Sequence, residues 1–159
     1  MARVAPPPLT PRDLMRGCSL DELVDLWSAD AFAERIAIEH HGIEIRFIKD
    51  LAAALRWKPI ELFGVLGVPE QSRFARNDYR VQGMPTLRCI ELLKTLGLAR
   101  EIAQRSADPA FAVDAWLGRW LLTPSYAFDG LRPIDWFDTP SGAAYVRHIL
   151  RAKESGVVI

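Results

Sequence analysis

The side chains best suited to specific polar contacts lie between Lys58 and Asp78, in the stretch KPIELFGVLGVPEQSRFARND. A helix, a glycine-containing turn and a second helix at this length give the outline of a helix-turn-helix. In that arrangement the second helix enters the major groove of DNA, where its outward side chains contact bases and phosphates. The DNA-contacting candidates are Gln71, Ser72, Arg73 and Arg76. Bulky Phe63 and acidic Glu70 favour the alternative, a plain helical hairpin inside a bundle.

Side chains that could catalyse a reaction or hold a metal are sparse. His40 and His41 are adjacent, so they point in different directions on a helix, and no cluster completes a metal site around them. Cys18 and Cys89 lie far apart, which argues against a disulfide framework and indicates a reducing cytoplasm. We expect His148 to be a surface or interface residue. Without a phosphate loop, nucleophile elbow or paired carboxylates, we expect no enzyme, no metal and no cofactor.

The net charge is zero, from 20 Lys and Arg against 20 Asp and Glu, but the charges are spread unevenly. Residues 40–105 hold 11 basic and 7 acidic side chains, a difference of +4. Such an excess could face a phosphate backbone or could belong to an ordinary solvated surface. No stretch approaches the ~20 apolar residues of a membrane span, and the first residues lack the apolar core of a signal peptide. We therefore expect no membrane association.

Apolar spacing and helix-start signals predict an all-α fold. A capping box joins Ser19 to Glu22, and proline recurs at the first helical position. The expected helices cover about 20–28, 31–42 (capped by Asp30), 44–56, 59–67, a segment from Pro69, 85–104, a segment from Asp108-Pro109, and a segment from Thr139-Pro140 to Leu150. The side chains expected to point inward include Phe32, Ile36, Phe74, Leu87 and Ala144. No segment alternates apolar and polar residues, so no sheet is expected.

The segment 123–138 is long for a loop, and it carries Tyr126, Phe128, Trp136 and Phe137. These aromatic residues indicate a loop packed down on the rest of the molecule. Within and after it, the following residues are expected to have structural roles: Gly130 in a turn with positive φ, Arg132 and Asp135 tying the loop to itself, and Asp138 with Thr139 capping the last helix.

From Trp120 onward the sequence has the spacing W-L-x-x-P-x-x-A-x-x-G-x-R-P-x-D, then D-T-x-x-G, then V-x-x-x-L, then Gly-Val. The residues in these positions are Trp120, Leu121, Pro124, Ala127, Gly130, Arg132, Pro133, Asp135, Asp138, Thr139, Gly142, Val146, Leu150, Gly156 and Val157. This block resembles the toxin-binding domain of Xre/MbcA/ParS antitoxins. Residues 43–105 resemble the Xre-like half of that family more weakly, and residues 1–42 resemble nothing that we can name.

The resemblance implies a helical bundle with an Xre-like helix-turn-helix half and a small C-terminal helical toxin-binding domain. Residues 19–105 would be the helix-turn-helix and dimerisation region, and residues 106–159 the toxin-binding domain. Before them, Pro6, Pro7, Pro8 and Pro11 indicate that residues 1–18 form a flexible segment. It also implies a RES-type toxin as partner, an enzyme that degrades NAD or transfers its ADP-ribose. The last helix and the tail would cover the NAD-binding cleft of that toxin. The complex would contain a homodimer within a larger hetero-oligomer, which would bind the promoter DNA of its own operon.

The positions that the resemblance assigns to toxin binding are Arg147, Leu150, Arg151, Lys153, Glu154, Ser155, Gly156, Val157, Val158 and Ile159. The carboxylate of Glu154 could pair with a toxin arginine that would otherwise hold the pyrophosphate of NAD, or it could be a solvated charge. Family tails often have Glu-Tyr-Gly where this chain has Ser155 between Glu154 and Gly156, so a potential aromatic anchor is missing.

The alternative function is a DNA-binding transcriptional regulator whose C-terminal half serves only oligomerisation. The basic excess of residues 40–105 and the helix-turn-helix outline support this alternative. From the residues alone, the apolar end at Val157, Val158 and Ile159 either frays or docks into a partner.

Overall fold

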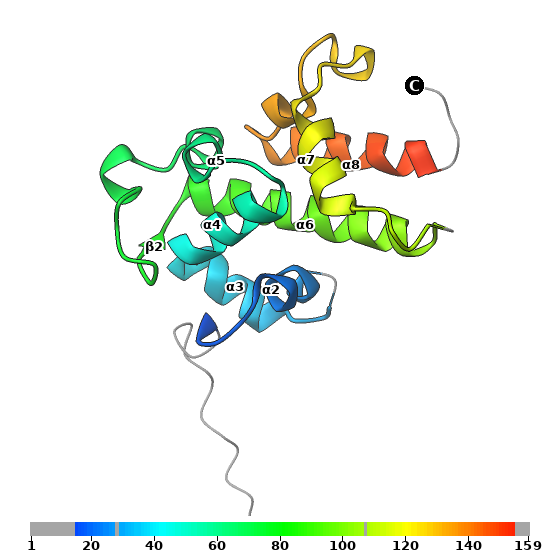
Figure 1. The fold of residues 1–159 in the computed structure, drawn as a ribbon. Helices are drawn as coiled ribbons and strands as arrows, with labels where there is room; N and C mark the ends of the chain where they lie inside the picture. The colour runs from blue at the N-terminus through cyan, green and yellow to red at the C-terminus, as the bar shows by residue number, and fades with distance from the viewer. Residues whose placement is uncertain (1–14, 28, 107, 155–159) are drawn as a thin grey trace, which may run out of the picture.

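The computed structural model describes residues 15–27, 29–106 and 108–154, which are predominantly helical (Figure 1). The helices are α2 (Leu20–Leu26), α3 (Phe32–His41), α4 (Ile45–Ala54), α5 (Pro59–Leu66), α6 (Met84–Gln104), α7 (Val113–Leu122) and α8 (Pro140–Glu154). Short 3-10 turns are η1 (Glu70–Ser72), η2 (Tyr126–Phe128) and η3 (Pro133–Trp136). The predicted all-α class is therefore confirmed.

The expectation that the chain has no sheet is wrong in one detail. Strands β1 (Ile43–Glu44) and β2 (Arg80–Val81) form a two-stranded antiparallel sheet, in which Ile43 pairs with Val81 and Glu44 with Arg80. Two residues are too few to give an alternating pattern, so the sequence carries no periodic signal for these strands.

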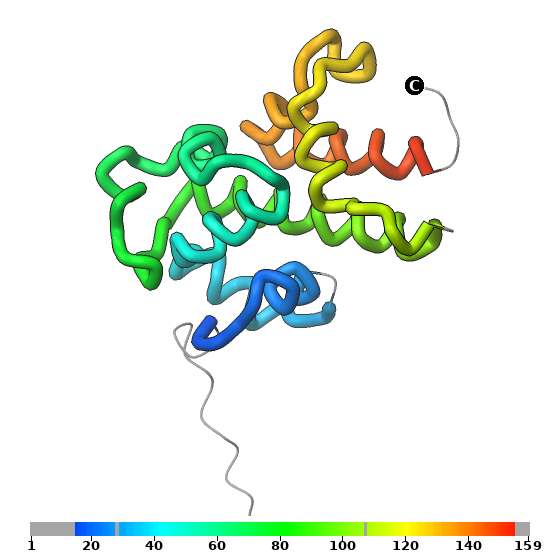
Figure 2. Tube along the Cα trace, viewed as in Figure 1, coloured from blue at the N-terminus to red at the C-terminus, as the bar shows by residue number. Residues whose placement is uncertain are grey.

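Helix α6 is the central element of the molecule, and α2, α5, α7 and α8 all pack against it. In the ribbon and tube views, α2 and α3 lie on one side of α6, and α7 and α8 lie on the other (Figures 1 and 2). One continuous hydrophobic cluster extends from Met15 to Leu150. The C-terminal helices therefore share their core with the rest of the described chain.

Most predicted helix starts are confirmed. The capping box holds α2, since Ser19 N donates to a Glu22 carboxylate oxygen at 2.7 Å and Glu22 N donates to Ser19 Oγ at 3.2 Å. Pro59 stands in the first turn of α5, as predicted. The Thr139 hydroxyl accepts a bond from Gly142 N at 3.1 Å and caps the start of α8.

Two helices start at residues other than those predicted. Helix α3 has Ala31 rather than Asp30 at its N-cap, with no side-chain cap. Helix α7 begins at Val113, because the segment after Asp108 forms a turn in which the Asp108 carboxylate accepts a bond from Ala110 N at 2.9 Å. A short polar side chain that bonds its own backbone stabilises such a turn in competition with a helix.

The inward face of α3 was also predicted wrongly, since Phe32 and Ile36 are exposed and Ile38 is buried. A polar contact explains the rotation of the helix. The guanidinium of Arg35 lies over the Trp27 and Phe32 rings at 5.6 and 5.4 Å and donates to the Trp27 carbonyl at 3.1 Å. The predictions that Leu87 and Ala144 point inward are wrong as well, because both residues are exposed.

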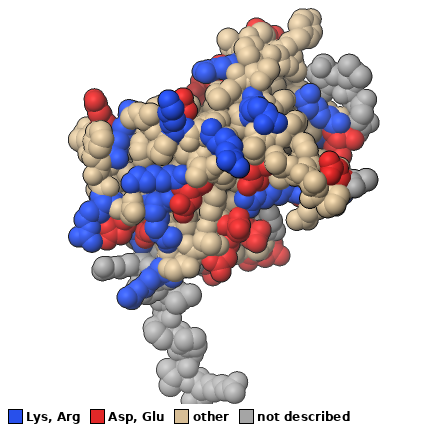
Figure 3. All heavy atoms as spheres, viewed as in Figure 1, with Lys and Arg blue, Asp and Glu red and all other residues tan. Residues whose placement is uncertain are grey.

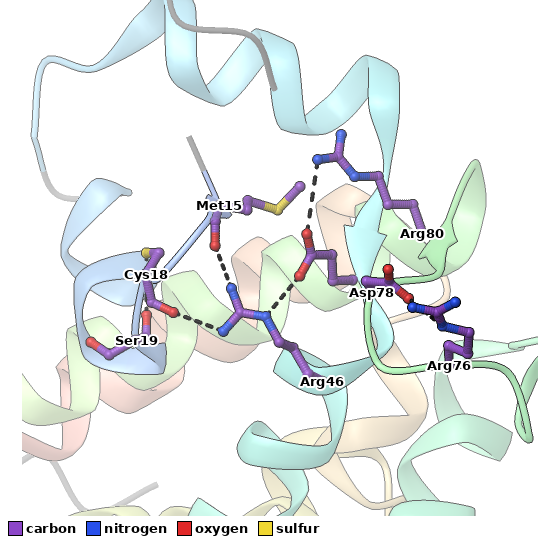
Figure 4. Close-up of polar contacts among 8 residues, drawn as sticks. Met15, Cys18, Ser19, Arg46, Arg76, Asp78 and Arg80 are labelled. Carbon is purple, nitrogen blue, oxygen red and sulfur yellow. Dashed lines mark hydrogen bonds and ion pairs between the residues drawn. The ribbon is translucent and has the colours of Figure 1, made fainter. Parts of the chain in front are cut away.

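Arg46, in the first turn of α4, ties residues 15–19 to the rest of the fold (Figure 4). Its guanidinium donates to the carbonyl oxygens of Met15 and Cys18, and it pairs with the Glu44 carboxylate at 2.7 Å. Glu44 is itself buried and belongs to strand β1 of the two-stranded sheet. Four charged and polar groups thus satisfy one another where the N-terminal segment meets α4.

A second junction joins the α4–α5 corner to α7. Trp57 Nε1 donates to the Gly118 carbonyl at 3.1 Å. A Cβ atom at position 118 would lie 2.0 Å from the carbonyl oxygen of Leu55, so only glycine allows this close approach. The contact fixes the position of α7 against the middle of the chain.

Candidate functional site

Helix α8 carries half of the residues that the resemblance assigned to partner binding. Val146, Ile149 and Leu150 are buried along one side, while Tyr145 and His148 are exposed along the other. The first turn of the helix lies close to η3, because a Cβ at Gly142 would come within 2.0 Å of the Trp136 carbonyl oxygen. The glycine of the D-T-x-x-G pattern is therefore required by the packing of α8 on the preceding loop.

Arg147 does not face outward. Its guanidinium is 2.7 Å from Glu91 Oε2 on α6, and the two side chains are only 15% and 14% exposed. The same Glu91 also accepts a bond from Lys94 at 2.8 Å. The Arg147–Glu91 contact is an ion pair without good hydrogen-bond alignment, since Glu91 Oε2 has no directed donor among the described residues. Arg147 therefore anchors α8 to α6, as buried Leu150 also does, and contact of either side chain with a partner stays a prediction.

The last turn of α8 is exposed at Arg151, Lys153 and Glu154. Glu154 pairs with Arg105 at the end of α6 at 3.3 Å, and Arg105 also pairs with Glu101. An apolar hollow of about 320 Å³ lies beside this turn, lined in part by Ile102, Phe111, Val113, Trp116 and Leu150. Ser155, Gly156, Val157, Val158 and Ile159, which complete the predicted toxin-binding set, lie outside the described residues.

The segment between α7 and α8 is packed down as predicted, with Phe128 fully buried among the rings of Trp120, Trp136 and Tyr145. Arg132 and Asp135 form the predicted tie at 2.6 Å. The hydrogen bond from Arg132 lowers the pKa of Asp135 below its ordinary value. Tyr126 is the exception, since its side chain is 94% exposed. The prediction that Tyr126 packs inward is wrong.

The predicted second helix of the helix-turn-helix is wrong, because the chain after Pro69 forms only the 3-10 turn η1 and an exposed loop. Phe74, expected to point inward, is 87% exposed. Gln71 and Arg76 are exposed, but Ser72 is buried and Arg73 donates to the Val68 carbonyl at 3.0 Å. These four residues do not share a helical face, and their contact with DNA stays a prediction.

Within the part of the chain that the structure describes, no group of three or more His, Cys, Asp and Glu side chains is placed to hold a metal ion. Over the same residues, no helix combines the length and apolarity that crossing a bilayer demands.

Comparison with known proteins gives two findings. Residues 106–156 match the family described as antitoxin Xre/MbcA/ParS C-terminal toxin-binding domain. The chain is also 28% identical over 126 residues to the Prs ADP-ribosylating antitoxin of Sphingobium sp. (strain YBL2), covering 77% of this chain and 79% of the relative. The chain therefore carries the C-terminal toxin-binding domain of an Xre/MbcA/ParS-type antitoxin. No solved structure matches the antitoxin significantly.

The matched domain of the antitoxin contains α7, η2, η3 and α8. Its exposed aromatic side chains include Tyr126 and Tyr145, which were absent from the set of binding residues assigned from the sequence. A signal for Tyr145 was available, since residues 145 and 148 lie on a different side of the helix from residues 146 and 150. No sequence signal marked Tyr126 as exposed, because aromatic residues in such a loop are usually buried, as its neighbour Phe128 is buried here.

Proposed function

We propose that this antitoxin neutralises a RES-type toxin that consumes NAD, and that it does so by covering the NAD-binding cleft with the end of α8 and residues 155–159. The match of residues 106–156 to a toxin-binding domain is the observation that carries the proposal. The relative named as an ADP-ribosylating antitoxin supports a partner that handles ADP-ribose, the group that such enzymes take from NAD. Binding would occur in the cytoplasm, where NAD is available.

The packing of α8 suits a helix that presents its end to another protein. The ion pair between Arg147 and Glu91 and the buried side of the helix hold α8 on α6, so the last turn is supported on a rigid element. That turn offers two cations, Arg151 and Lys153, and the carboxylate of Glu154. A rigid support lowers the entropy that the antitoxin loses when it binds.

Glu154 is the residue proposed to replace the pyrophosphate of NAD. Its carboxylate already pairs with a guanidinium, that of Arg105, at 3.3 Å. Exposed ion pairs contribute only about 0–1 kcal/mol, so exchanging Arg105 for an arginine of the toxin costs little. Inside a cleft from which water is excluded, the new charge-assisted pair is the stronger one.

Co-expression with the toxin encoded beside this gene tests the proposal, with cell growth and cellular NAD as readouts. The full chain is expected to restore both, and a chain ending at residue 154 is expected to restore neither. Glu154→Gln should weaken neutralisation, whereas Glu101→Gln is the matched control, since Glu101 also pairs with Arg105 but lies on α6. Equal rescue by the full and shortened chains would show that the tail does not cover the cleft.

Binding to promoter DNA is a second candidate function, favoured by the distribution of charge. Lys and Arg side chains gather on the side of the molecule that contains α4, α5 and β2 (Figure 3). The start of α4 is not free to hold a phosphate, because Ile45 N and Arg46 N donate to the carbonyls of Tyr79 and Asn77. Contact would therefore come from exposed side chains such as Gln71 and Arg76. We expect a promoter shift that weakens as salt rises, and no shift even at low salt would remove this function.

We further propose that the antitoxin forms a homodimer through residues 19–105, within the larger complex with the toxin. This region exposes several large apolar side chains, namely Phe32, Ile36, Ile60, Met84 and Leu87. Exposed apolar surface of this kind often marks a protein interface. Light scattering of the antitoxin alone should give twice the mass of one chain.

A further inference from the structure

Tyr126 is the most exposed of the large apolar side chains in the described residues, with 94% of its surface accessible. It lies in η2, inside the stretch that matches the toxin-binding domain. An aromatic ring that is left in water forgoes the free energy of burial, roughly 1.5–3 kcal/mol for a large apolar side chain. Because Tyr126 lies inside a binding domain, burial of its ring against the partner would supply that free energy.

The turn that carries Tyr126 is held by its own hydrogen bonds. Ser125 N donates to the Leu131 carbonyl at 3.1 Å, and Gly130 N donates to the Ser125 carbonyl at 3.0 Å. The Ser125 hydroxyl accepts a bond from Ala127 N at 3.3 Å. Buried Phe128, two residues after Tyr126, fixes the turn to the core. The backbone that presents the ring is therefore set before any partner arrives.

Two side chains of α8 continue this surface. Tyr145 donates its hydroxyl hydrogen to the Ala127 carbonyl at 3.0 Å, next to Tyr126 in the turn. The Tyr145 ring stacks on His148 one turn further along, at 6.3 Å between centroids. We call Tyr126, Tyr145 and His148 the aromatic rim. The rim runs from the η2 turn along the exposed side of α8.

The aromatic rim is separate from the end of α8. Tyr145 precedes Glu154 by nine residues, which corresponds to ~14 Å along the axis of a helix. In Figure 1 the loop containing η2 stands above α8, on the side of that helix away from α6. A toxin that receives the end of α8 in its cleft would meet the rim with a different part of its surface.

We infer that the aromatic rim is a second toxin-binding surface and that Tyr126 is its anchor, which inserts into an apolar pocket outside the NAD-binding cleft. The inference rests on the proposed function, since the occupant is the same toxin. Rigid tyrosines supply large contact areas at low cost in conformational entropy, and they are enriched among the residues that dominate binding energies. The toxin is the occupant rather than a second copy, because the rim lies within residues 106–156, whereas most exposed apolar side chains of residues 19–105 lie on α3, α5 and α6.

The test is the affinity of full-length variants for the purified toxin encoded beside this gene, together with inhibition of its NAD consumption. Tyr126→Ala should bind about 30-fold more weakly or worse, the loss typical of an anchor residue. At saturating concentration it should still inhibit the toxin completely, because residues 151–159 are unchanged. Phe74→Ala is the matched control: an aromatic side chain 87% exposed, but outside the toxin-binding domain. It should bind as tightly as the unchanged chain.

The two proposals fail in different ways. If the unchanged antitoxin does not bind the toxin, the proposed function is wrong. If the unchanged antitoxin binds and Tyr126→Ala binds within threefold of it, the rim is not an interface and this inference alone is overturned. The inference also fails if Tyr126→Ala alters the oligomeric state of the antitoxin without toxin, since the occupant would then be a second copy. Because the side chain is almost wholly exposed, the thermal midpoint should not change, and measuring it checks that the variant folds.

Discussion

Replacing Arg147 by alanine tests the claim that this residue holds the molecule together rather than contacting the toxin. The change removes the guanidinium that lies 2.7 Å from Glu91. The Glu91 side chain, which is only 14% exposed in the structure, then faces α8 without that partner. Breaking a fully buried ion pair costs about 3–5 kcal/mol, because one charge is left without its partner. Lys94 still pairs with Glu91 at 2.8 Å, so part of the charge remains compensated. We therefore expect Arg147→Ala to lower the free energy of unfolding by about 2–3 kcal/mol.

Thermal and chemical unfolding of the free antitoxin measure this loss. For a chain of this size the loss corresponds to a fall of about 5–10 °C in the thermal midpoint. Lys153→Ala, on the exposed last turn of the same helix, is the control and should change the free energy of unfolding by less than about 0.5 kcal/mol. A double variant, Glu91→Leu with Arg147→Met, removes both charges and should recover most of the stability.

Two outcomes would refute the reasoning on Arg147. One is an Arg147→Ala variant as stable as the Lys153→Ala control. The other is a double variant as unstable as the sum of its single changes, which would mean that the two side chains do not interact. If Arg147→Ala kept full stability but lost toxin binding, the original assignment of Arg147 to the toxin interface would be correct instead.

Three further predictions concern the fold. Gly118→Ala should lower the free energy of unfolding by about 3 kcal/mol, because its Cβ would meet a backbone oxygen at 2.0 Å; an unfolding midpoint equal to that of the unchanged chain would contradict this. Burial raises the pKa of Cys89 to about 12, so at pH 8 a thiol reagent should modify only Cys18 in the folded antitoxin and both cysteines in denaturant. The pKa of Asp135 is lowered from 3.8, so its contribution to stability is complete above that pH and is lost as the pH falls below it. The free energy of unfolding should therefore fall less steeply at acidic pH in Asp135→Asn than in the unchanged chain. An equally steep fall in both would show that the Arg132–Asp135 ion pair contributes nothing to stability.

The elements with strong local signals were predicted well. The capping box at Ser19, the proline at the start of α5 and the apolar stripe of α4 each act within a few residues, so the sequence contains the whole cause. The same holds for the tie between Arg132 and Asp135, which are three residues apart. Order and spacing of residues over the C-terminal block were likewise sufficient to indicate the toxin-binding domain.

The errors occur where distant contacts decide the outcome. Arg35 sets the rotation of α3 through rings and carbonyls up to nine residues away, so an amphipathic pattern alone placed Phe32 inward. The strands β1 and β2 pair across more than 35 residues, and neither has a periodic signal of its own.

The sequence by itself determined the helical class, most helix starts and the antitoxin family, because these depend on local propensity and on the order of residues along the chain. Only the tertiary structure decided which face of each helix is available to a partner. It buried Leu150, paired Arg147 with Glu91 of α6 and left Tyr126 in solvent, since the packing of α8 against α6 and of Phe128 under the η2 turn selects the buried side. That selection is a property of the assembled core, and no single segment encodes it.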